Sequence, residues 1–210
     1  MKLTEMTVSQ FLTELGSDSP APGGGSTAAL EGAMGAALSA MVHTLTTGKA
    51  AYADYETQIA DGLAQTKDLS NRLLAAVDSD TAAFLTVSEA FSMPKGTDAE
   101  KQARSAAIQK GLALCTESPF QMMVLSVETL AGIQRQLGYF NQSAASDLGV
   151  AALSLGAAVR GAWLNVLINL QSLKDKELAQ TYQSKGQALL ERADALSSQI
   201  YDQILALLQA

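Results

Sequence analysis

SPAPGGGS, residues 19–26, is the stretch around which the rest of the chain is organised. Its two prolines stiffen the approach, because each fixes its own φ and moves the preceding residue away from helix. Its three glycines carry no Cβ, so a ligand or another backbone can come close. Ser26 is a good N-cap for a helix predicted to begin at Thr27, whose free N–H groups favour an anionic or carbonyl oxygen. The alternative interpretation is a flexible turn between two helices.

The helix predicted over 27–47 should lie at the centre of the fold. Small residues recur along it every four positions, and such rows let a second backbone approach closely. Its surface exceeds what one bundle needs, so we expect part of it to serve a dimer. Gly48 is a natural C-terminal stop. The two rows are Ala28, Gly32, Ala36, Ala40 and Ala29, Ala33, Ala37, Met41.

The remaining pattern is helix after helix, joined by short turns. Thr97 followed by Glu100 fits a capping box, and Pro119 is expected to interrupt a helix by a kink or a fresh start. No strand and no internal repeat is recognisable, so we predict an all-α fold, one domain over 1–210, with a single bundle of roughly seven to nine helices. The further helices are predicted over 4–15, 52–91, 98–117 resuming to 137, 144–171 and 175–209.

Composition narrows the class of protein. Of 210 residues, 48% are hydrophobic, mostly alanine, and the net charge of −7 speaks against nucleic acid as a partner. The single Cys115 suits a reducing compartment and is expected to be a small buried hydrophobe. Without an apolar N-terminal core of signal-peptide length, we predict a cytoplasmic protein. Two weakly charged stretches, 26–47 and 148–170, are expected to be buried helices and not membrane spans, because the second holds Arg160.

Few residues carry chemistry by themselves. No metal-ligand spacing is present, and the only histidine, His43, is expected to be a packed helix residue. Asp78 and Asp80 stand two apart on a helix, so at most one can face inward. Asp147 lies in the first turn of its helix, where the helix dipole keeps a carboxylate ionised. The carboxylate could serve in a site, or it could simply complement the charge of the helix end.

Two turns are the places to look for a site. The glycine turn and the turn at 138–142 each precede an apolar helix, and they could converge on one ligand, which sequence alone leaves open. In the helix after the second turn, Asn165 and Asn169 stand among Leu, Val and Ala, so both are expected to be buried and hydrogen-bonded.

The whole chain resembles the cyclodeaminase/cyclohydrolase family of folate enzymes, which includes the C-terminal domain of formiminotransferase-cyclodeaminase. The order and spacing of several short motifs carry this resemblance, although each alone is weak. They are SPAPGGGS at 19–26, Gly48-Lys49 with Tyr52, Asp80-x-x-Ala83-Phe84, Met93-Pro94-Lys95, NQSAASDLG at 141–149 and NVLINLQSLKD at 165–175.

The resemblance implies a helical homodimer acting on tetrahydrofolate derivatives, without metal or nicotinamide. It implies that backbone N–H groups of the glycine turn hold oxygens of the folate, and that Asp147, helped by Ser146 and Asn141, faces the reacting centre. A fixed carboxylate there would stabilise the methenyl cation and manage a proton. The turn residues so implied are Pro22, Gly23, Gly24, Gly25 and Ser26, and the candidate partners of the glutamate tail are Lys49, Lys95, Arg160 and Lys174.

The expected reaction is hydrolysis of 5,10-methenyltetrahydrofolate to 10-formyltetrahydrofolate. The alternative is cyclodeamination of 5-formiminotetrahydrofolate, which forms the methenyl compound and ammonia. A third possibility is a helical dimer that binds folate or a partner protein without turnover. A departure from the family pattern motivates it, Phe140 in place of a glycine, and Ser143 in place of an asparagine is a second departure beside Asp147.

Overall fold

The computed structural model describes residues 2–210 and is helical throughout, with no strand in that range. The predicted all-α class is confirmed, but six α-helices form in place of the seven to nine expected. They are α1 (Val8–Leu15), α2 (Gly24–Thr46), α3 (Glu56–Ser92), α4 (Asp98–Gln136), α5 (Ala145–Leu170) and α6 (Lys176–Gln209), with short 3-10 helices η1 (Leu3–Glu5), η2 (Ala50–Tyr55) and η3 (Gln142–Ala144).

Pro119 accounts for part of the lower count. It lies inside α4 without ending the helix, so of the two expected alternatives, a kink or a fresh start, the fresh start is wrong. Proline has no N–H, which leaves the carbonyl four residues earlier, that of Cys115, without its helical donor. Asn169 of α5 supplies the missing hydrogen bond, because its Nδ2 donates to the Cys115 carbonyl at 2.8 Å. A tertiary contact therefore keeps α4 continuous.

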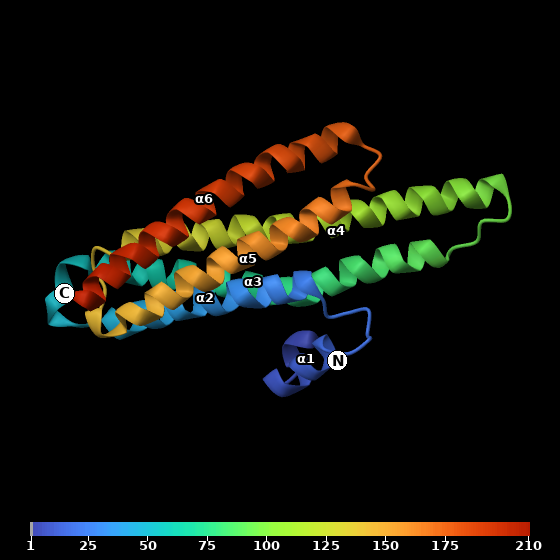
Figure 1. The fold of residues 1–210 in the computed structure, drawn as a ribbon. Coiled ribbons are helices and arrows are strands. Elements are labelled where there is room, and N and C mark those ends of the chain that lie inside the picture. The colour runs from blue at the N-terminus through green and yellow to red at the C-terminus, as the bar shows by residue number, and fades with distance from the viewer. Residues whose placement is uncertain (1) are drawn as a thin grey trace.

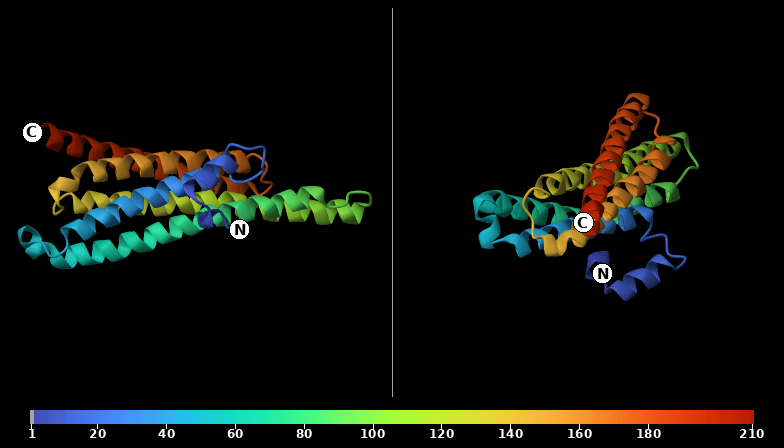
Figure 2. Two further views of the ribbon diagram at one scale, coloured as in Figure 1. Left: turned by 90° about the horizontal axis from the view of Figure 1, so that it is seen from below. Right: turned by 60° about the vertical axis from the view of Figure 1, so that its left-hand side comes forward.

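The long helices form one elongated bundle (Figure 1). α2 lies against α3 and α5, and α4 lies against α3, α5 and α6. The hairpin of α3 and α4 extends beyond the other helices, whereas α1 stands to one side of the bundle, as the two further views agree (Figure 2). The central position predicted for the small-residue helix is confirmed.

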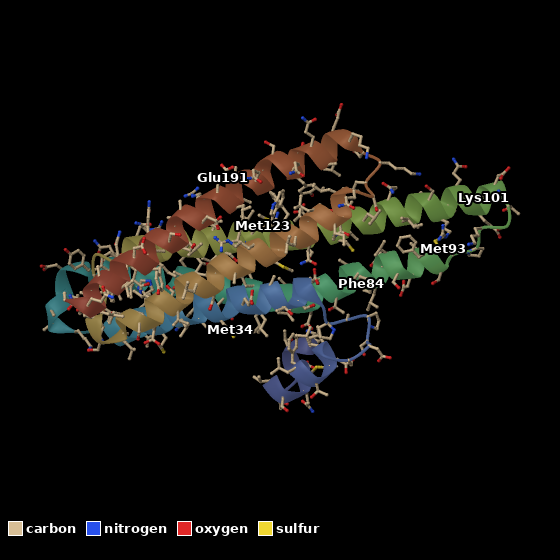
Figure 3. The ribbon with its side chains drawn as sticks, in the orientation of Figure 1. Met34, Phe84, Met93, Lys101, Met123 and Glu191 are labelled. Atoms are coloured by element: carbon tan, nitrogen blue, oxygen red, sulfur yellow. The ribbon has the colours of Figure 1, made fainter. Side chains whose placement is uncertain are left out.

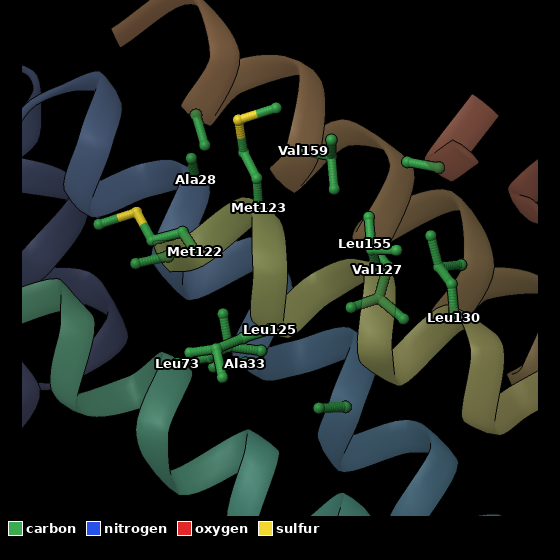
Figure 4. Packing of buried hydrophobic residues seen from close by; sticks show 14 of the residues in the cluster. Ala28, Ala33, Leu73, Met122, Met123, Leu125, Val127, Leu130, Leu155 and Val159 are labelled. Carbon is green, nitrogen blue, oxygen red and sulfur yellow. The ribbon is translucent and has the colours of Figure 1, made fainter. Parts of the chain in front are cut away.

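Close packing follows from the small residues of α2. A Cβ at Gly35 would lie 2.7 Å from Leu155 Cγ and 2.9 Å from the Ala151 carbonyl oxygen, so only glycine fits there. The core around this crossing is dry and mostly aliphatic, with Leu73, Met123 and others interdigitating (Figure 4). Such density makes α2 a rigid element against which a site can be held.

The start of α2 differs from expectation. The helix begins at Gly24 with Gly23 as its N-cap, so the prediction of Ser26 as N-cap is wrong. Ser26 lies instead in the first turn, 1% exposed, with its hydroxyl toward α3. The end is as predicted, since Gly48 follows with φ +70°, a conformation that glycine adopts without strain.

One side of the bundle remains apolar and uncovered. Residues 142–170 are long and apolar enough to cross a membrane by length and composition, and half of the most apolar window is buried in the bundle. Met34, labelled in Figure 3, is 49% exposed on α2. We call the exposed apolar residues of α2 and α5 the outer apolar face: Met34, Met41, Leu45, Val150, Leu153, Leu164 and Ile168.

Candidate active site

The first turn of α2 is enclosed between α3 and α5. A Cβ at Gly25 would lie 2.6 Å from the carboxyl carbon of Asp80, which no real side chain tolerates. A Cβ at Gly24 would lie 3.4 Å from Asn165 Nδ2. The glycines therefore let a carboxylate from α3 and a carboxamide from α5 approach the free N–H groups of the helix end.

Asp80 is the residue whose electrostatics stand out at this turn. Burial raises the pKa of its carboxyl group, and hydrogen bonds from the side chain and the backbone N–H of Ser26 oppose that rise. The Ser26 hydroxyl donates to Asp80 Oδ2 at 3.4 Å and lies 3.3 Å from the Thr81 hydroxyl. A buried carboxyl beside hydrogen-bond donors is placed to accept a proton and return it.

Asp78, two residues earlier, has a structural role. Its carboxylate accepts hydrogen bonds from Leu3 N at 2.7 Å and from the Thr4 hydroxyl at 2.6 Å, so it ties the N-terminal segment to α3. Asp80 alone reaches the glycine turn, which confirms that at most one of the pair faces inward. Asp80 was not among the site residues expected from sequence, although the motif containing it is part of the family resemblance.

The two asparagines of α5 are half-buried and hydrogen-bonded, close to what the sequence predicted. Asn165 Nδ2 donates to the Gly161 carbonyl at 2.9 Å, and Asn169 Nδ2 donates to the Asn165 carbonyl at 2.8 Å. These bonds use the amide N–H groups. The carbonyl oxygen of the Asn165 side chain is left as an acceptor beside Gly24, within 3.7 Å of where a Cβ would stand.

An open groove of about 740 Å³ lies over the same turn on the side of α5. Burial raises the pKa of Glu31 there. Arg160 is already occupied, because its Nε donates to Asp194 at 2.9 Å. Predicted site residues Pro22, Gly23 and Gly24 line the groove together with Leu15, Thr27, Ala28, Glu31, Ala157, Arg160 and Gly161.

The turn at 138–142 lies at the opposite end of α2 from the glycine turn. Asn141 N donates to the Thr46 hydroxyl at 3.0 Å, and Asn141 Nδ2 donates to the Leu45 carbonyl at 3.3 Å. Asp147 is half-buried in the first turn of α5, and Ser146 is exposed. Since α2 has 23 residues, about 33 Å of helix separates the two turns, which do not converge within one chain.

The two departures from the family pattern also receive positions. Phe140 is 6% exposed and packs into the hydrophobic core, so it does not close the space in front of the turn. Ser143 is exposed, and its backbone N–H donates to Asn141 Oδ1 at 3.2 Å. Neither side chain obstructs Asp147.

Two of the predicted lysines share one site. Lys95 and Lys174 line a groove of about 400 Å³ at the extended end of the bundle, where Figure 3 labels Lys101. Lys174 Nζ donates to the Ser105 hydroxyl at 2.7 Å. Lys49 is exposed just after α2, far from this groove. We call the four cations that gather there the basic groove: Lys95, Lys101, Arg104 and Lys174.

The arrangement at the glycine turn supports acid–base chemistry on a substrate that carries a carbonyl oxygen. Backbone N–H groups supply donors, Asn165 supplies an acceptor, and Asp80 supplies a proton-transfer group. Across residues 2–210, no three His, Cys, Asp or Glu side chains gather in a way that could hold a metal ion.

Comparisons with known proteins agree on one family. The family model described as formiminotransferase-cyclodeaminase matches residues 7–188. The methenyltetrahydrofolate cyclohydrolase of Methylorubrum extorquens is 40% identical over 200 residues, covering 94% of this chain and 95% of that protein. The formimidoyltransferase-cyclodeaminase of Mus musculus is 34% identical over 191 residues, covering 91% of this chain but 35% of that protein.

A solved structure shares the fold. It is the formiminotetrahydrofolate cyclodeaminase of Thermotoga maritima, which aligns with a TM-score of 0.81 over 99% of this chain and 98% of that chain. Sequence identity with it is 23%, so the likeness concerns the fold. The chain spans about a third of the length of the animal relatives it matches and nearly all of the bacterial one.

Proposed function

The chain belongs to the formiminotransferase-cyclodeaminase family, and we propose that it hydrolyses 5,10-methenyltetrahydrofolate to 10-formyltetrahydrofolate. The relative that bears this activity in its name matches over almost its whole length, which supports the reaction assigned. The structural observation that carries the proposal is the buried carboxyl of Asp80 against the glycine turn.

The proposed chemistry uses the Asp80 carboxylate twice. A water attacks the carbon that bridges N5 and N10, and its proton passes to Asp80 as the carbon–oxygen bond forms. The bond between that carbon and N5 then breaks, and Asp80 returns a proton to N5. The remaining hydroxyl proton is released, which leaves the formyl group on N10. Before attack, the carboxylate also stabilises the cation spread over N5 and N10.

Cyclodeamination is the second candidate, favoured by the names of the animal relatives. N10 would attack the formimino carbon carried on N5, and Asp80 would move the N10 proton to the nitrogen that leaves as ammonia. The same carboxylate thus serves both reactions, and the substrate decides between them. A non-catalytic folate binder is the weaker third candidate, because Phe140 packs into the core and leaves the turn open.

The basic groove is proposed to bind the glutamate tail of the folate. Asn165, beside the glycine turn, precedes the end of α5 at Leu170 by five residues, about 8 Å of helix, and Lys174 follows in the next loop. A substrate with its ring at the glycine turn would therefore extend its carboxylates toward Lys95 and Lys174. Lys49 is too distant to contribute from the same chain.

A homodimer formed through the outer apolar face is also proposed. That face exposes Met34, Leu153 and Leu164 by 49, 53 and 67%, and apolar side chains gathered in this way are typical of an interaction surface. Self-association by a two-fold axis buries the same patch on both copies. A stable monomer at micromolar concentration in sedimentation would contradict this part of the proposal.

A two-fold axis would have a consequence for the site. α2 and α5 run antiparallel, since Asn165 lies at the start of α2 and Asn141 at its end. An axis through the middle of the outer apolar face exchanges the two ends of α2. The glycine turn and Asp80 of one protomer would then lie near Asp147 and Ser146 of its partner, which would give the predicted catalytic residues a common site.

The chain is further proposed to act in the cytoplasm without metal or nicotinamide, and without binding nucleic acid or membrane. The negative net charge of −7 and the buried, unpaired Cys115 support this setting.

The experiment uses the absorbance of the methenyl chromophore. Protein is mixed with 5,10-methenyltetrahydrofolate or with 5-formiminotetrahydrofolate, and the Asp80→Asn variant serves as the control. Accelerated loss in the first mixture supports hydrolysis, and accelerated gain with ammonium release in the second supports cyclodeamination. Binding of folate without either change would support the non-catalytic candidate.

A further inference from the structure

A second cavity lies at the other end of the bundle, between the end of α2, the start of α3 and the end of α4. Its volume is about 220 Å³. His43, on its wall, is 19 residues from Gly24, about 28 Å along α2, so the cavity is separate from the glycine turn. It is lined by His43, Gln58, Asp61, Gly62, Gln65, Thr66, Leu69, Thr129, Gly132, Arg135 and Tyr139.

His43 is buried there without a complete set of hydrogen bonds. The side chain is 3% exposed, and its Nδ1 has no hydrogen-bond partner. Burial lowers the pKa of the imidazole to about 4, so the ring is neutral at physiological pH. A buried nitrogen without a partner is unfavourable, because it has lost its hydrogen bond to water. By contrast, buried Gln136 of α4 accepts a hydrogen bond from the Ser39 hydroxyl at 3.0 Å.

The walls around the imidazole crowd one face of the ring and offer free acceptors. A Cβ at Gly62 would lie 2.7 Å from His43 Nε2, so glycine is required on that wall. Thr66 donates its hydroxyl proton to the Gly62 carbonyl, and Thr129 donates to the Leu125 carbonyl at 2.8 Å. Both hydroxyl oxygens therefore keep lone pairs that a bound molecule can use.

Opposite charges line the same cavity from two helices. Arg135 of α4 and Asp61 of α3 form no ion pair with any residue in 2–210. Arg135 Nη2 donates to Gln65 Oε1 at 3.3 Å, which leaves the other N–H groups of the guanidinium available. A molecule that carries both a carboxylate and an ammonium group matches this pair, whereas a simple anion would face the charge of Asp61.

We propose that the cavity binds a small free α-amino acid as a zwitterion, with its carboxylate on Arg135, its ammonium on Asp61 and a hydrogen bond to His43. Three observations on different elements carry this: the unpartnered imidazole, the free acceptors of the Thr66 and Thr129 hydroxyls, and the unpaired opposite charges. The site is independent of the proposed reaction, so failure of one leaves the other standing.

The test uses the one histidine of the chain as a reporter. Ring resonances of His43 are followed by NMR at pH 7 while glycine, serine or glutamine is added to the full-length protein. Acetate and methylammonium, each carrying one half of the zwitterion, are the matched probes. We expect saturable shifts with at least one amino acid at a Kd on the order of 1 mM, and at least tenfold weaker effects with either half.

Variants decide whether the shift reports this site. Arg135→Gln and Asp61→Asn should each weaken binding about tenfold, whereas Arg72→Gln, which removes an exposed ion pair with Asp68 on α3, should leave it unchanged. Asp80→Asn should also bind normally. The proposal is overturned if no amino acid shifts the His43 resonances at about 20 mM, if acetate acts as strongly as glycine, or if Arg135→Gln binds like the unmodified protein.

Discussion

The two ends of α2 differ in how their polar groups are used. At its C-terminal end, Asn141 N donates to the Thr46 hydroxyl and Asn141 Nδ2 donates to the Leu45 carbonyl, so the turn is bonded to the helix. At its N-terminal end, Asp80 and Asn165 surround the first turn without satisfying all its N–H groups. The C-terminal end of α2 holds the fold together, whereas its N-terminal end retains donors and a proton-transfer group for a ligand.

The glycines at the two ends of α2 differ in the same way. Gly48, after the C-terminal end, has φ +70° and open space around it, so glycine is there for backbone conformation. Gly25 is in ordinary helix, and glycine is there because a carboxyl carbon lies 2.6 Å from the position of a Cβ. Crowding by a polar side chain, more than the number of glycines, marks the end that can bind substrate.

Asp80→Asn should have the largest effect. The amide keeps the shape of the side chain but cannot accept the proton of the attacking water, so kcat should fall by about 10²–10⁴ with little change in KM. Steady-state assay of methenyl absorbance measures both. Asp78→Asn is the matched control, since that residue only binds Leu3 and Thr4. An Asp80→Asn enzyme with more than about half the original kcat would exclude this carboxylate from catalysis.

Asp147→Asn should lower kcat by about 10–100-fold if the partner protomer completes the site. The decisive experiment mixes the Asp147→Asn variant with the Asp80→Asn variant. In a mixed dimer, one of the two sites would contain an intact Asp80 and the other protomer's intact Asp147, so mixing two weak variants in equal amounts should restore about a quarter of the original rate. Activity that stays at the mean of the two variants would mean that each site lies within one chain.

Gly25→Ala should have the next largest effect. The added methyl group must displace the Asp80 carboxylate, so we expect kcat about tenfold lower or worse and about 1–3 kcal/mol less stability. Gly23→Ala is the matched change on the same turn, because nothing lies within 4 Å of its Cβ position. Urea unfolding and the absorbance assay compare the two. Equal behaviour of the two variants would show that Gly25 is not crowded in solution.

His43 makes stability at the other end depend on pH. Its folded pKa of about 4 is below the unfolded value of 6.5, so the unfolded chain binds more protons between these values and stability falls as pH drops. We expect this residue to remove about 2 kcal/mol between pH 7 and pH 5. Urea unfolding of His43→Gln at both pH values isolates the contribution, since Asp80 and Glu31, with raised pKa values, act in the opposite direction.

The basic groove should give the smallest effect. Lys95→Gln with Lys174→Gln should raise KM about tenfold for a folate with several glutamates and leave kcat unchanged, because the tail is far from the reacting carbon. Lys185→Gln, exposed on α6, is the control. A fall in kcat with constant KM would place these lysines outside tail binding.

Much of the fold could be predicted from sequence because its signals are local. The capping box of Thr97 and Glu100, the stop at Gly48 and the small-residue helix all form as expected. The continuity of α4 past Pro119 could not be predicted, because it depends on Asn169 from another helix. Ser26 failed as an N-cap because the helix begins two residues earlier, at Gly24, where Asp80 and Asn165 of other helices lie against the glycines.

The site was harder to predict than the fold. The turn at 19–26 was expected to bind substrate because of its glycines, and this stays a prediction, whereas Lys95 and Lys174 line one groove. The family resemblance pointed to Asp147 as the catalytic carboxylate, whereas the burial of Asp80 by a neighbouring helix is not visible in sequence. That the two turns lie at opposite ends of α2 follows only from the antiparallel packing of α2 and α5.

The most direct measurement is the decay of methenyl absorbance when purified protein is added to 5,10-methenyltetrahydrofolate, with Asp80→Asn and buffer alone run in parallel. If the glycine turn and Asp80 form a cyclohydrolase site, the unmodified protein accelerates the decay strongly, and the variant approaches the rate of buffer while still binding folate. Equal decay rates in all three, with the protein folded and folate bound, would contradict catalysis at this site.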